Sequence, residues 1–426
     1  MNPSQAVVRV GRVGADGDGV GALAGGEAVY LPRTLPGELV RPGGLIRRGE
    51  GWVGSAEIIE ASAQRVAPPC RHFGVCGGCA LQHWAMPDYL AWKAGLLAAA
   101  LRRAGFEGVA LAPVAATPAG ARRRIELALR RDAATIVIGL HQARGSAVVD
   151  MQECVVLHPV LFGLIAPLRG VLRGLSALRR EGSAVLNLLD SGPDLLLRLD
   201  ADLDAGDRTR LAAFAAAHGL PRISWSRRDR PSETACLLRP PVVAFAGTAV
   251  TPPPGAFLQA SREGEAAIMA AVLAGLPEKL APRARVAELY AGCGTLSFAL
   301  AGRARVAAFE GDAAAAAALG AAVNAARLAG RVTVQCRDLA RQPLSAKELS
   351  AFAAVVLDPP HGGAAAQIGL IAAAKVARVI YVSCNPGTLA RDAAVLRGAG
   401  YRLLSANPVD QFLWSARLES VAVFAR

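Results

Sequence analysis

An apolar run near the end of the chain, Val379-Ile380-Tyr381-Val382, leads directly into Ser383-Cys384-Asn385-Pro386. A similar run earlier in the chain, Val355-Val356-Leu357, leads into Asp358-Pro359-Pro360. Because strand-like and helix-like segments alternate regularly from residue 285 onward, we expect an α/β region with a doubly wound parallel sheet. Ligands of such sheets bind outside the carboxyl ends of the strands, so Asp358 and Cys384 should face one crevice. A thiol in that position is a candidate nucleophile.

The start of the same region has the pattern of a nucleotide-type cofactor site. Residues 285–290 predict a strand, and a turn containing Gly292 and Gly294 joins it to a helix that opens at Thr295. Glycine lets the backbone approach a ligand closely at the N-terminus of a helix. A single Gly-x-Gly is a weak signal, because many sheet proteins turn in this way.

Acidic residues at the ends of the following strands strengthen this interpretation. Glu310 ends the second strand and is suited to bind two ribose hydroxyls, and Asp338 follows the third and can accept a hydrogen bond from an adenine amino group. Asp358 ends the fourth. The ordered set, without a phosphate-binding lysine or a full Gly-x-Gly-x-x-Gly, favours S-adenosylmethionine over a dinucleotide. The last two predicted strands, 401–404 and 420–424, are suited to an antiparallel edge pair.

The rest of the chain divides into two further parts. Residues 5 to 60 contain short alternating strands with frequent glycine, which indicates a small β-barrel. From about 110 to 250 the pattern is mixed, with strands at 125–129 and 136–140, a helix from 160 and another around 207–218. Pro252-Pro253-Pro254-Gly255 is the best linker candidate. We therefore expect an OB-like domain at 1–61, a central α+β domain at 62–251 and the α/β domain at 252–426.

The composition indicates a globular protein with a polyanionic partner. A chain of 426 residues is too long for one compact core, and an apolar fraction of 53% with 19% charged residues excludes a disordered chain. The net charge of +13 favours RNA or DNA as a partner. Only four of the 47 basic residues are Lys, which a general bias toward Arg in the source organism would explain equally well.

Targeting or membrane segments are not expected. The N-terminus does not resemble a signal peptide. The most apolar helical stretch, Val160 to Leu178, contains Arg169 and Arg173 and is too short and too charged to span a membrane. We expect a soluble cytoplasmic protein that does not bind membranes.

The cysteines are unevenly distributed. Cys70, Cys76 and Cys79 lie in one short loop, and Cys154 is a candidate fourth thiolate. Disulfides are rare in the cytoplasm, whereas zinc and iron–sulfur clusters both accept four cysteines, so the spacing leaves the metal open. We expect the remaining cysteines outside the strand end to be small core residues: Cys236, Cys293 and Cys336.

The cysteine loop, the Asp-Pro-Pro strand end and Ser383-Cys384-Asn385-Pro386 resemble the RNA (uracil-5-)-methyltransferase family, in its iron–sulfur-containing branch. The N-terminal segment, with Val29-Tyr30-Leu31-Pro32 and Leu35-Pro36-Gly37-Glu38, resembles a TRAM domain, an OB-like module that binds RNA. The resemblance covers nearly the whole chain. It implies a Rossmann-like class I methyltransferase domain, a 4Fe-4S cluster on the four cysteines and RNA as the partner. It also implies that residues 86–112 can pack on the C-terminal domain and that the protein is a monomer.

The resemblance also implies a set of site residues. Carbon 5 of uracil is a poor nucleophile, so the Cys384 thiolate would first attack carbon 6. Carbon 5 would then take the methyl group, and Glu419 would remove the carbon 5 proton as the general base. A base stacked in RNA cannot reach the thiol, so the target must be single-stranded or flipped out. The residues expected to line the cofactor and base pocket are Gln259, Tyr290, Gly292, Gly294, Thr295, Glu310, Asp338 and Asp358.

Three segments depart from the pattern of this family. The usual Gln-x-Asn is Gln259-Ala260-Ser261, the usual Asp-Pro-Pro-Arg ends in His361, and residues 408–418 lack the common His/Thr pattern. These changes bear on RNA contacts more than on chemistry. The barrel and the cysteine loop favour 23S rRNA over tRNA as the target. Two other functions stay open: amino-methylation of adenine or guanine, which needs no cysteine, and non-catalytic RNA binding by a relict methyltransferase domain.

Overall fold

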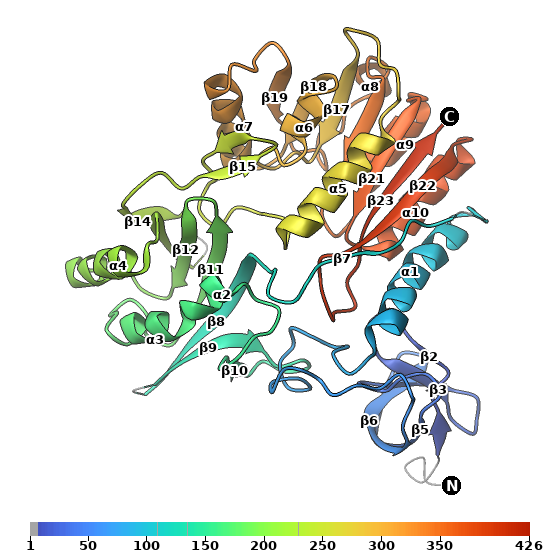
Figure 1. Ribbon diagram of the computed structural model, residues 1–426, viewed down its shortest axis with the longest axis vertical. Helices are drawn as coiled ribbons and strands as arrows, with labels where there is room; N and C mark the ends of the chain where they lie inside the picture. The colour runs from blue at the N-terminus through green and yellow to red at the C-terminus, as the bar shows by residue number, and fades with distance from the viewer. Residues whose placement is uncertain (1–6, 109, 134, 229) are drawn as a thin grey trace.

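The computed structural model describes residues 7–108, 110–133, 135–228 and 230–426. Residues 1–6 lie outside the described ranges. They belong to the expected N-terminal domain and to the N-terminus that does not resemble a signal peptide. None of the described helices is long and apolar enough to cross a membrane. Three large sheets organise the chain, coloured blue, green and yellow to red along the sequence in Figure 1.

The C-terminal region contains an eight-stranded sheet with the order β19-β18-β17-β20-β21-β23-β22-β7. Its parallel part consists of β17 (Arg285–Leu289), β18 (Arg305–Glu310), β19 (Val332–Cys336), β20 (Ala354–Leu357) and β21 (Arg378–Ser383). The central strands are almost continuously apolar because both of their faces are buried. The expected doubly wound parallel sheet is therefore confirmed.

The other end of this sheet differs from the sequence expectation. β23 (Glu419–Ala425) lies between β21 and β22 (Arg402–Asp410) and is antiparallel to both. The two-residue strand β7 (Ala115–Ala116) then pairs with β22. The last two long strands do pair antiparallel, but the expectation that they form the edge is wrong, because β7 covers β22.

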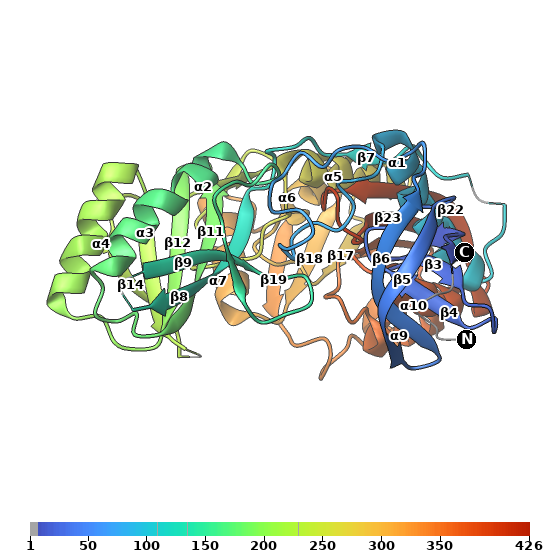
Figure 2. The same cartoon turned by 90° about the horizontal axis from the view of Figure 1, so that it is seen from below.

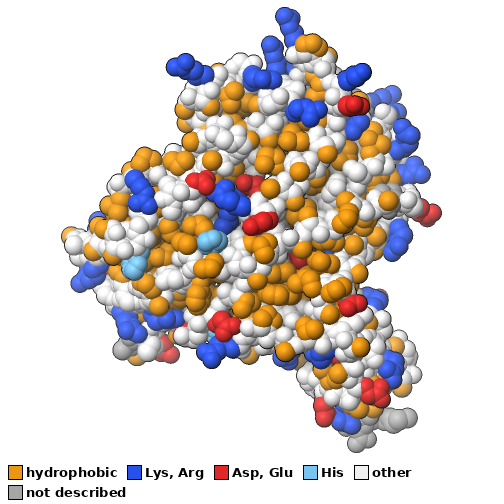
Figure 3. Space-filling model, in the orientation of Figure 1, with side chains coloured by type: hydrophobic (Ala, Val, Ile, Leu, Met, Phe, Trp, Pro, Cys, Tyr) orange, Lys and Arg blue, Asp and Glu red, His pale blue; other side chains and the backbone are white. Residues whose placement is uncertain are grey.

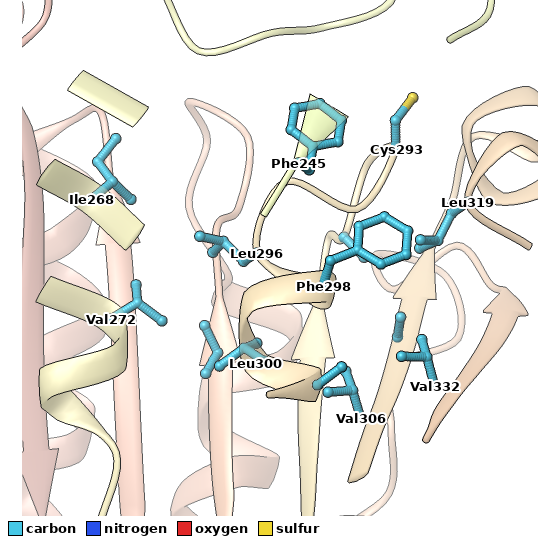
Figure 4. Packing of buried hydrophobic residues seen from close by; sticks show 14 of the residues in the cluster. Phe245, Ile268, Val272, Cys293, Leu296, Phe298, Leu300, Val306, Leu319 and Val332 are labelled. Atoms are coloured by element: carbon cyan, nitrogen blue, oxygen red, sulfur yellow. The ribbon is translucent and has the colours of Figure 1, made fainter. Parts of the chain in front are cut away.

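Helices cover both faces of the C-terminal sheet. One core contains residues of α5 (Arg262–Gly275), α6 (Ser297–Ala301) and α7 (Ala313–Ala325), and Figure 4 shows part of it. The other contains residues of α8 (Ala346–Leu349), α9 (Ala365–Ala373), α10 (Pro386–Gly398) and α1 (Met86–Arg103). Side chains alternate between the faces along a strand, so neighbouring residues of β17 join different cores: Val286 the first and Ala287 the second.

The central region is a seven-stranded sheet with the order β10-β9-β8-β11-β12-β13-β14. Its strands are β8 (Arg124–Asp132), β9 (Thr135–His141), β10 (Val148–Asp150), β11 (Glu181–Leu189), β12 (Gly192–Leu199), β13 (Arg222–Arg227) and β14 (Glu233–Leu237). The expected helix from residue 160 is two helices, α2 (Pro159–Gly163) and α3 (Ile165–Arg173), which with α4 (Ala205–His218) share one core with the sheet. A hairpin of β15 (Val243–Phe245) and β16 (Thr248–Val250) follows.

The N-terminal region is a six-stranded sheet with the order β1-β5-β6-β4-β3-β2. Its strands are β1 (Val8–Arg9), β2 (Arg12–Val13), β3 (Gly19–Ala22), β4 (Ala28–Leu31), β5 (Leu39–Arg48) and β6 (Gly51–Glu60). It encloses a small core that includes Val29, Leu31 and Val40. Figure 2 shows the central sheet toward one end of the elongated molecule and the other two sheets toward the opposite end.

Helix α1 follows the cysteine loop in sequence but packs on the C-terminal sheet. Leu97 and Leu101 belong to the same core as α9 and α10. The buried Lys93 ammonium lies 2.9 Å from Asp410 Oδ1, and the Tyr89 hydroxyl donates to Asp410 Oδ2 at 2.6 Å. These contacts hold the end of β22, from which a loop of residues 411–418 leads to the start of β23.

Candidate active site

Cys384 and Glu419 lie opposite one another across two neighbouring strands. The antiparallel pairing of β21 with β23 matches Ser383 with Ser420, so one step further along this register Cys384 faces Glu419. Cys384 is partly exposed, whereas Glu419 is 3% exposed. Asn385 caps the N-terminus of α10 through a hydrogen bond from Gly387 N to its Oδ1 at 2.9 Å, which fixes the turn that presents the cysteine.

Asp358 lies at the end of β20, next to β21 in the sheet. Burial raises its pKa to about 7, and a hydrogen bond from Gln259 Nε2 to Asp358 Oδ2 at 3.1 Å opposes this rise. Burial also raises the pKa of Glu419 well above its ordinary value, and the charge of Asp358 adds to the effect. The structure thus brings together the cysteine and the two carboxylates that the sequence predicts for the reaction.

The predicted cofactor residues lie at the ends of the neighbouring strands. Tyr290 and Gly292 follow β17 with positive φ angles of 64° and 57°. Gly292 N donates to Glu310 Oε2 at 2.7 Å, and Asp312 N donates to Glu310 Oε1 at the same distance. Asp338, which follows β19, accepts from Ala340 N at 2.9 Å. Glu310 is thereby held against the turn after β17, whereas the bond of Asp338 lies within its own loop.

Glycine is required at position 294 by close packing as well as by the backbone conformation. Its φ is 98°, and a Cβ at this position would lie 2.5 Å from Leu319 Cδ1 and 2.8 Å from the Phe298 ring. Figure 4 shows these two side chains pointing toward each other. Thr295 follows in the turn before α6. The turn therefore lies directly against α6 and α7 at Gly294, whereas a Cβ added at Gly292 would meet no atom within 4 Å.

The sequence did not reveal Glu288, a buried carboxylate in the middle of this region. It lies in β17 with 2% exposure, and the hydroxyl of Ser297 donates to it. Burial raises its pKa to about 8, to which the charges of Asp358 and Glu310 contribute. The signal for it in the sequence was an acidic residue inside an otherwise apolar strand.

Gln411 and Arg123 are two further residues that sequence reasoning missed. Gln411 Nε2 donates to Glu419 Oε2 at 2.8 Å and to Gln259 Oε1 at 2.7 Å. Arg123, just before β8 of the central sheet, donates to the carbonyl of Gln259 at 3.0 Å and pairs with Glu265 of α5. The run of three arginines at 122–124 was a visible signal, but it is typical of a basic surface, whereas Arg123 is 2% exposed.

The cysteine loop brings its three thiols together with the fourth. Cys70, Cys76, Cys79 and Cys154 line one largely apolar cavity with Leu140, Met151 and Val155 among others. Burial raises the pKa of Cys76 and of Cys154, and it raises the pKa of Cys79 to about 12. Among the described residues, no group of three or more His, Cys, Asp or Glu side chains is arranged to hold one metal ion.

The other cysteines follow the sequence expectation only in part. Cys293 is buried in the C-terminal core, as expected. Cys236 is partly buried and packs against the central core, whereas Cys336 is exposed, so the expectation of a core residue is wrong for Cys336. Both belong to the outermost strands of their sheets, β19 and β14, which are less completely covered.

The departures from the family pattern have different structural settings. Ser261 is the N-cap of α5, because its Oγ accepts a hydrogen bond from Gly264 N at 2.9 Å. Serine and asparagine are both good N-caps, so the cap is preserved at this position. His361 is exposed, and its carbonyl accepts from Asn385 Nδ2 at 3.1 Å. This bond ties the segment after Asp358 to the turn after Cys384.

On the face shown in Figure 3, Lys and Arg side chains lie mostly toward the outline of the molecule, with orange hydrophobic side chains across much of the middle. Arg124, at the start of β8, lies over the ring of Phe257, which is 62% exposed, at 5.2 Å from its centroid. Phe257 precedes Gln259 by two residues in the sequence, and Gln259 is the residue that donates a hydrogen bond to Asp358.

Comparisons with known proteins agree with this geometry. The family model of the tRNA (Uracil-5-)-methyltransferases matches residues 281–426. An uncharacterized RNA methyltransferase of Caulobacter vibrioides is 40% identical over 98% of this chain and 99% of its own length. The 23S rRNA (uracil(1939)-C(5))-methyltransferase RlmD of Halomonas elongata is 36% identical over 95% of this chain and 86% of its own.

One solved structure shares the fold along the whole chain. It is the tRNA (uracil-54, C5)-methyltransferase of Pyrococcus abyssi in complex with S-adenosyl-L-homocysteine, with a TM-score of 0.75, 21% identity and 100% coverage of both chains. At this identity the similarity shows that the fold is the same.

Proposed function

As a member of the RNA (uracil-5-)-methyltransferase family, this chain is an S-adenosylmethionine-dependent RNA methyltransferase, and we propose that it methylates carbon 5 of a uridine through a covalent bond from Cys384. The observation that carries this proposal is the position of Cys384 opposite Glu419, with Asp358 at the end of the adjacent strand. A nucleophile and two carboxylates meet at the edge of the sheet where Glu310 and Asp338 would hold the methyl donor.

The reaction begins with a bond between Cys384 Sγ and carbon 6 of uracil, which moves the electrons of the ring double bond onto the carbon 4 oxygen. Burial raises the pKa of the thiol to about 11, so at neutral pH it carries a proton. Asp358 would accept that proton as the bond forms, so that Glu419 stays ionised for the later removal of the carbon 5 proton. Carbon 5 then attacks the methyl group of the sulfonium, and S-adenosylhomocysteine leaves.

Glu419 completes the reaction as the general base. It removes the proton of carbon 5, the double bond between carbons 5 and 6 forms again, and the sulfur of Cys384 leaves as a thiolate that takes its proton back from Asp358. The proton on Glu419 is released to solvent before the next turnover. The raised pKa of Glu419 makes it a stronger base than an exposed carboxylate once it is ionised. Asp358 would hydrogen-bond the edge of the uracil ring and hold the ring during these steps. The uridine must be flipped out or unpaired to enter.

We propose 23S rRNA as the substrate. The relative from Halomonas elongata that carries this activity in its name covers nearly the whole chain, including the N-terminal and central regions. The expected TRAM-like domain at 1–61 and the central domain at 62–251 would supply RNA contacts, with catalysis in 252–426. The protein would act as a monomer in the cytoplasm. The alternative is a uridine in tRNA, modified by the same chemistry.

Mapping 5-methyluridine across cellular RNA, with and without this gene, tests the proposal. Loss of one 5-methyluridine from 23S rRNA is the expected result. Loss from tRNA instead would make tRNA the substrate without changing the proposed reaction. Methylation of adenine or guanine amino groups that survives Cys384→Ala would favour the amino-methyltransferase alternative. Cofactor binding without methylation of any RNA would favour the relict RNA-binding protein.

We propose that Cys70, Cys76, Cys79 and Cys154, which line one cavity, bind a 4Fe-4S cluster. Four cysteine thiolates are ligands that both zinc and a 4Fe-4S cluster accept, so the choice between the two rests on the resemblance to the iron–sulfur-containing branch of the family. A backbone N–H group also donates to one of the sulfurs, because Gly78 N lies 3.5 Å from Cys76 Sγ. Such hydrogen bonds stabilise cluster thiolates. When bound, the cluster would tie the loop to Cys154 and carry electrons or serve as a structural link.

A further inference from the structure

Gln411 is one of the two middle members of a row of four polar side chains in the active site, which runs from Glu419 through Gln411 and Gln259 to Asp358. Its amide Nε2 donates to Glu419 Oε2 at 2.8 Å and to Gln259 Oε1 at 2.7 Å. Gln259 in turn donates to Asp358 Oδ2 at 3.1 Å. The two carboxylates of the proposed reaction are therefore connected through two amides, and Gln411 is the member that contacts the proposed base.

The orientation of the Gln411 amide is fixed by its surroundings. Its Oε1 accepts a hydrogen bond from Ala260 N at 2.9 Å. Because a backbone N–H can only donate, the amide oxygen must face Ala260, and both protons of Nε2 must then point toward Glu419 and Gln259. The side chain is 4% exposed, so water does not compete for these positions.

Packing and the adjacent residue hold Gln411 in place. Gly264 of α5 lies so close that an added Cβ would be 2.7 Å from the Cβ of Gln411. Asp410, the preceding residue, is buried and bound by the Lys93 ammonium and the Tyr89 hydroxyl of α1. These contacts hold the Gln411 amide in a fixed position beside the Glu419 carboxylate.

The two carboxylate oxygens of Glu419 differ in their hydrogen bonds. Oε2 accepts from Gln411, whereas the buried Oε1 has no hydrogen-bond partner within the described part of the chain. A buried carboxylate oxygen without a partner is costly and is expected where chemistry requires a free acceptor.

We propose that Gln411 is a positioning residue, which holds the Glu419 carboxylate by Oε2 so that Oε1 is free to take the proton of carbon 5. This inference rests on the proposed function of Glu419. In each turnover the proton passes from carbon 5 to Oε1, the electrons of that C–H bond restore the ring double bond, and the Cys384 sulfur leaves with the electrons of its bond to carbon 6. Gln411 exchanges no proton.

The hydrogen bond also affects when Glu419 is ionised. It stabilises the charged carboxylate and so lowers the pKa of Glu419, against the effects of burial and of Asp358. The groups that face Glu419 are Asp358 at the end of β20, Cys384 at the end of β21 and, in the preceding loop, Arg417 near the thiol. Removal of the Gln411 donor should therefore move the acid limb of the pH–rate profile to higher pH.

The test compares wild type with Gln411→Met, which keeps the length of the side chain and removes its hydrogen bonds. Turnover on RNA with the target uridine should fall about 10- to 100-fold with little change in KM for RNA. The covalent enzyme–RNA adduct should accumulate, since proton removal becomes slow while attack by Cys384 continues. The acid limb should move to higher pH, so the defect should shrink in alkaline buffer.

Gln367→Met is the matched control. Gln367 is also a fully buried glutamine, and its amide makes two hydrogen bonds with the backbone of Leu344, away from the carboxylates. This variant should lose thermal stability without adduct accumulation or a shift in the pH profile. If Gln411→Met behaved like Gln367→Met in these two readouts, the positioning role would be refuted.

RNA with 5-fluorouridine at the target separates this inference from the proposed function. Fluorine cannot be removed by a base, so wild type and Gln411→Met should both form the methylated covalent adduct to the same extent. No adduct with wild type would overturn the proposed function itself. Equal adduct together with wild-type turnover of uridine RNA by Gln411→Met would overturn only the inference.

A second variant keeps the test decisive if Gln411→Met does not fold. Gln411→Glu retains an oxygen for Ala260 N but places a carboxylate against Glu419. Like charges this close raise the pKa of one partner, so the acid limb should move further than in Gln411→Met. An unchanged pH profile in this variant would also contradict the role of Gln411.

Discussion

The carboxylate of Glu419 faces the thiol of Cys384, and after burial itself it is the largest cause of the raised pKa of that thiol, which is about 11. Asp358 contributes in the same direction. The free enzyme therefore keeps its nucleophile protonated at neutral pH, which protects a partly exposed cysteine from oxidation and alkylation. Activation then depends on the uridine entering and on a carboxylate that accepts the thiol proton.

Replacement of Glu419 by Gln should make Cys384 more reactive in the absence of RNA. The variant removes the main negative charge facing the thiol, so the pKa of Cys384 should fall below that of wild type. The measurement is the rate of iodoacetamide alkylation of the Cys384 peptide between pH 7 and 10. Cys236 in the same samples is the internal control, and an unchanged pH midpoint for Cys384 would contradict the assigned contact.

The same Glu419→Gln variant should trap the reaction intermediate on RNA. Without a base the proton of carbon 5 stays in place, and the thioether to Cys384 cannot be eliminated. A denaturing gel should show a methylated protein–RNA adduct, absent from Cys384→Ala. Cys384→Ala should still bind S-adenosylhomocysteine, and Cys236→Ala should behave as wild type. Turnover by Cys384→Ala would exclude the covalent scheme.

Residues next to regular strands could be predicted from sequence, because their positions depend on local patterns. Asp358 and Cys384 each end a run of apolar residues, and parallel strands place such ends at one edge. Gln411 could not be found in this way. Its partners Gln259 and Glu419 approach it only through tertiary structure, and a single glutamine in a loop has no local signal.

The errors of the sequence analysis have the same physical origin. Periodicity detected the apolar stretch from residue 160 but not the break at Leu164 that divides it into α2 and α3. Cys336 follows the pattern of a buried strand, yet β19 is the outermost strand of its sheet and leaves the thiol exposed. Local patterns identify an element, whereas its neighbours decide which side chains are covered.

Replacement of Glu288 by Gln should stabilise the protein at alkaline pH. The pKa of Glu288 is about 8 in the folded protein, whereas a glutamate in the unfolded chain ionises near 4.5. Between these pH values the unfolded chain releases a proton that the folded protein retains, so stability falls as pH rises. Each pKa unit corresponds to about 1.4 kcal/mol, which gives a loss on the order of 3–5 kcal/mol by pH 8.

Urea denaturation at pH 5 and pH 8 measures this effect. The difference between wild type and Glu288→Gln should be small at pH 5 and should favour the variant at pH 8, because the amide can keep a hydrogen bond to Ser297 and never ionises. Glu263→Gln, in the exposed first turn of α5, is the control and should retain the pH dependence of wild type. A variant less stable than wild type at pH 8 would contradict the prediction.

Anaerobic purification should yield a brown protein whose absorption near 400 nm depends on the four cysteines of the loop. The cavity draws Cys70, Cys76 and Cys79 from one segment and Cys154 from the segment after β10, so binding the metal should also hold these two segments together. Cys154→Ser should lose the absorption and become sensitive to proteolysis within residues 70–80, whereas Cys236→Ser should keep both properties of wild type.

Backbone contacts extend this effect to the active site, because Ala80 N and Leu81 N donate to the carbonyl of Trp414, in the loop that leads to Glu419. Cys154→Ser should therefore also lower the rate of adduct breakdown more than the rate of adduct formation. A colourless protein with stoichiometric zinc after anaerobic purification would exclude the cluster.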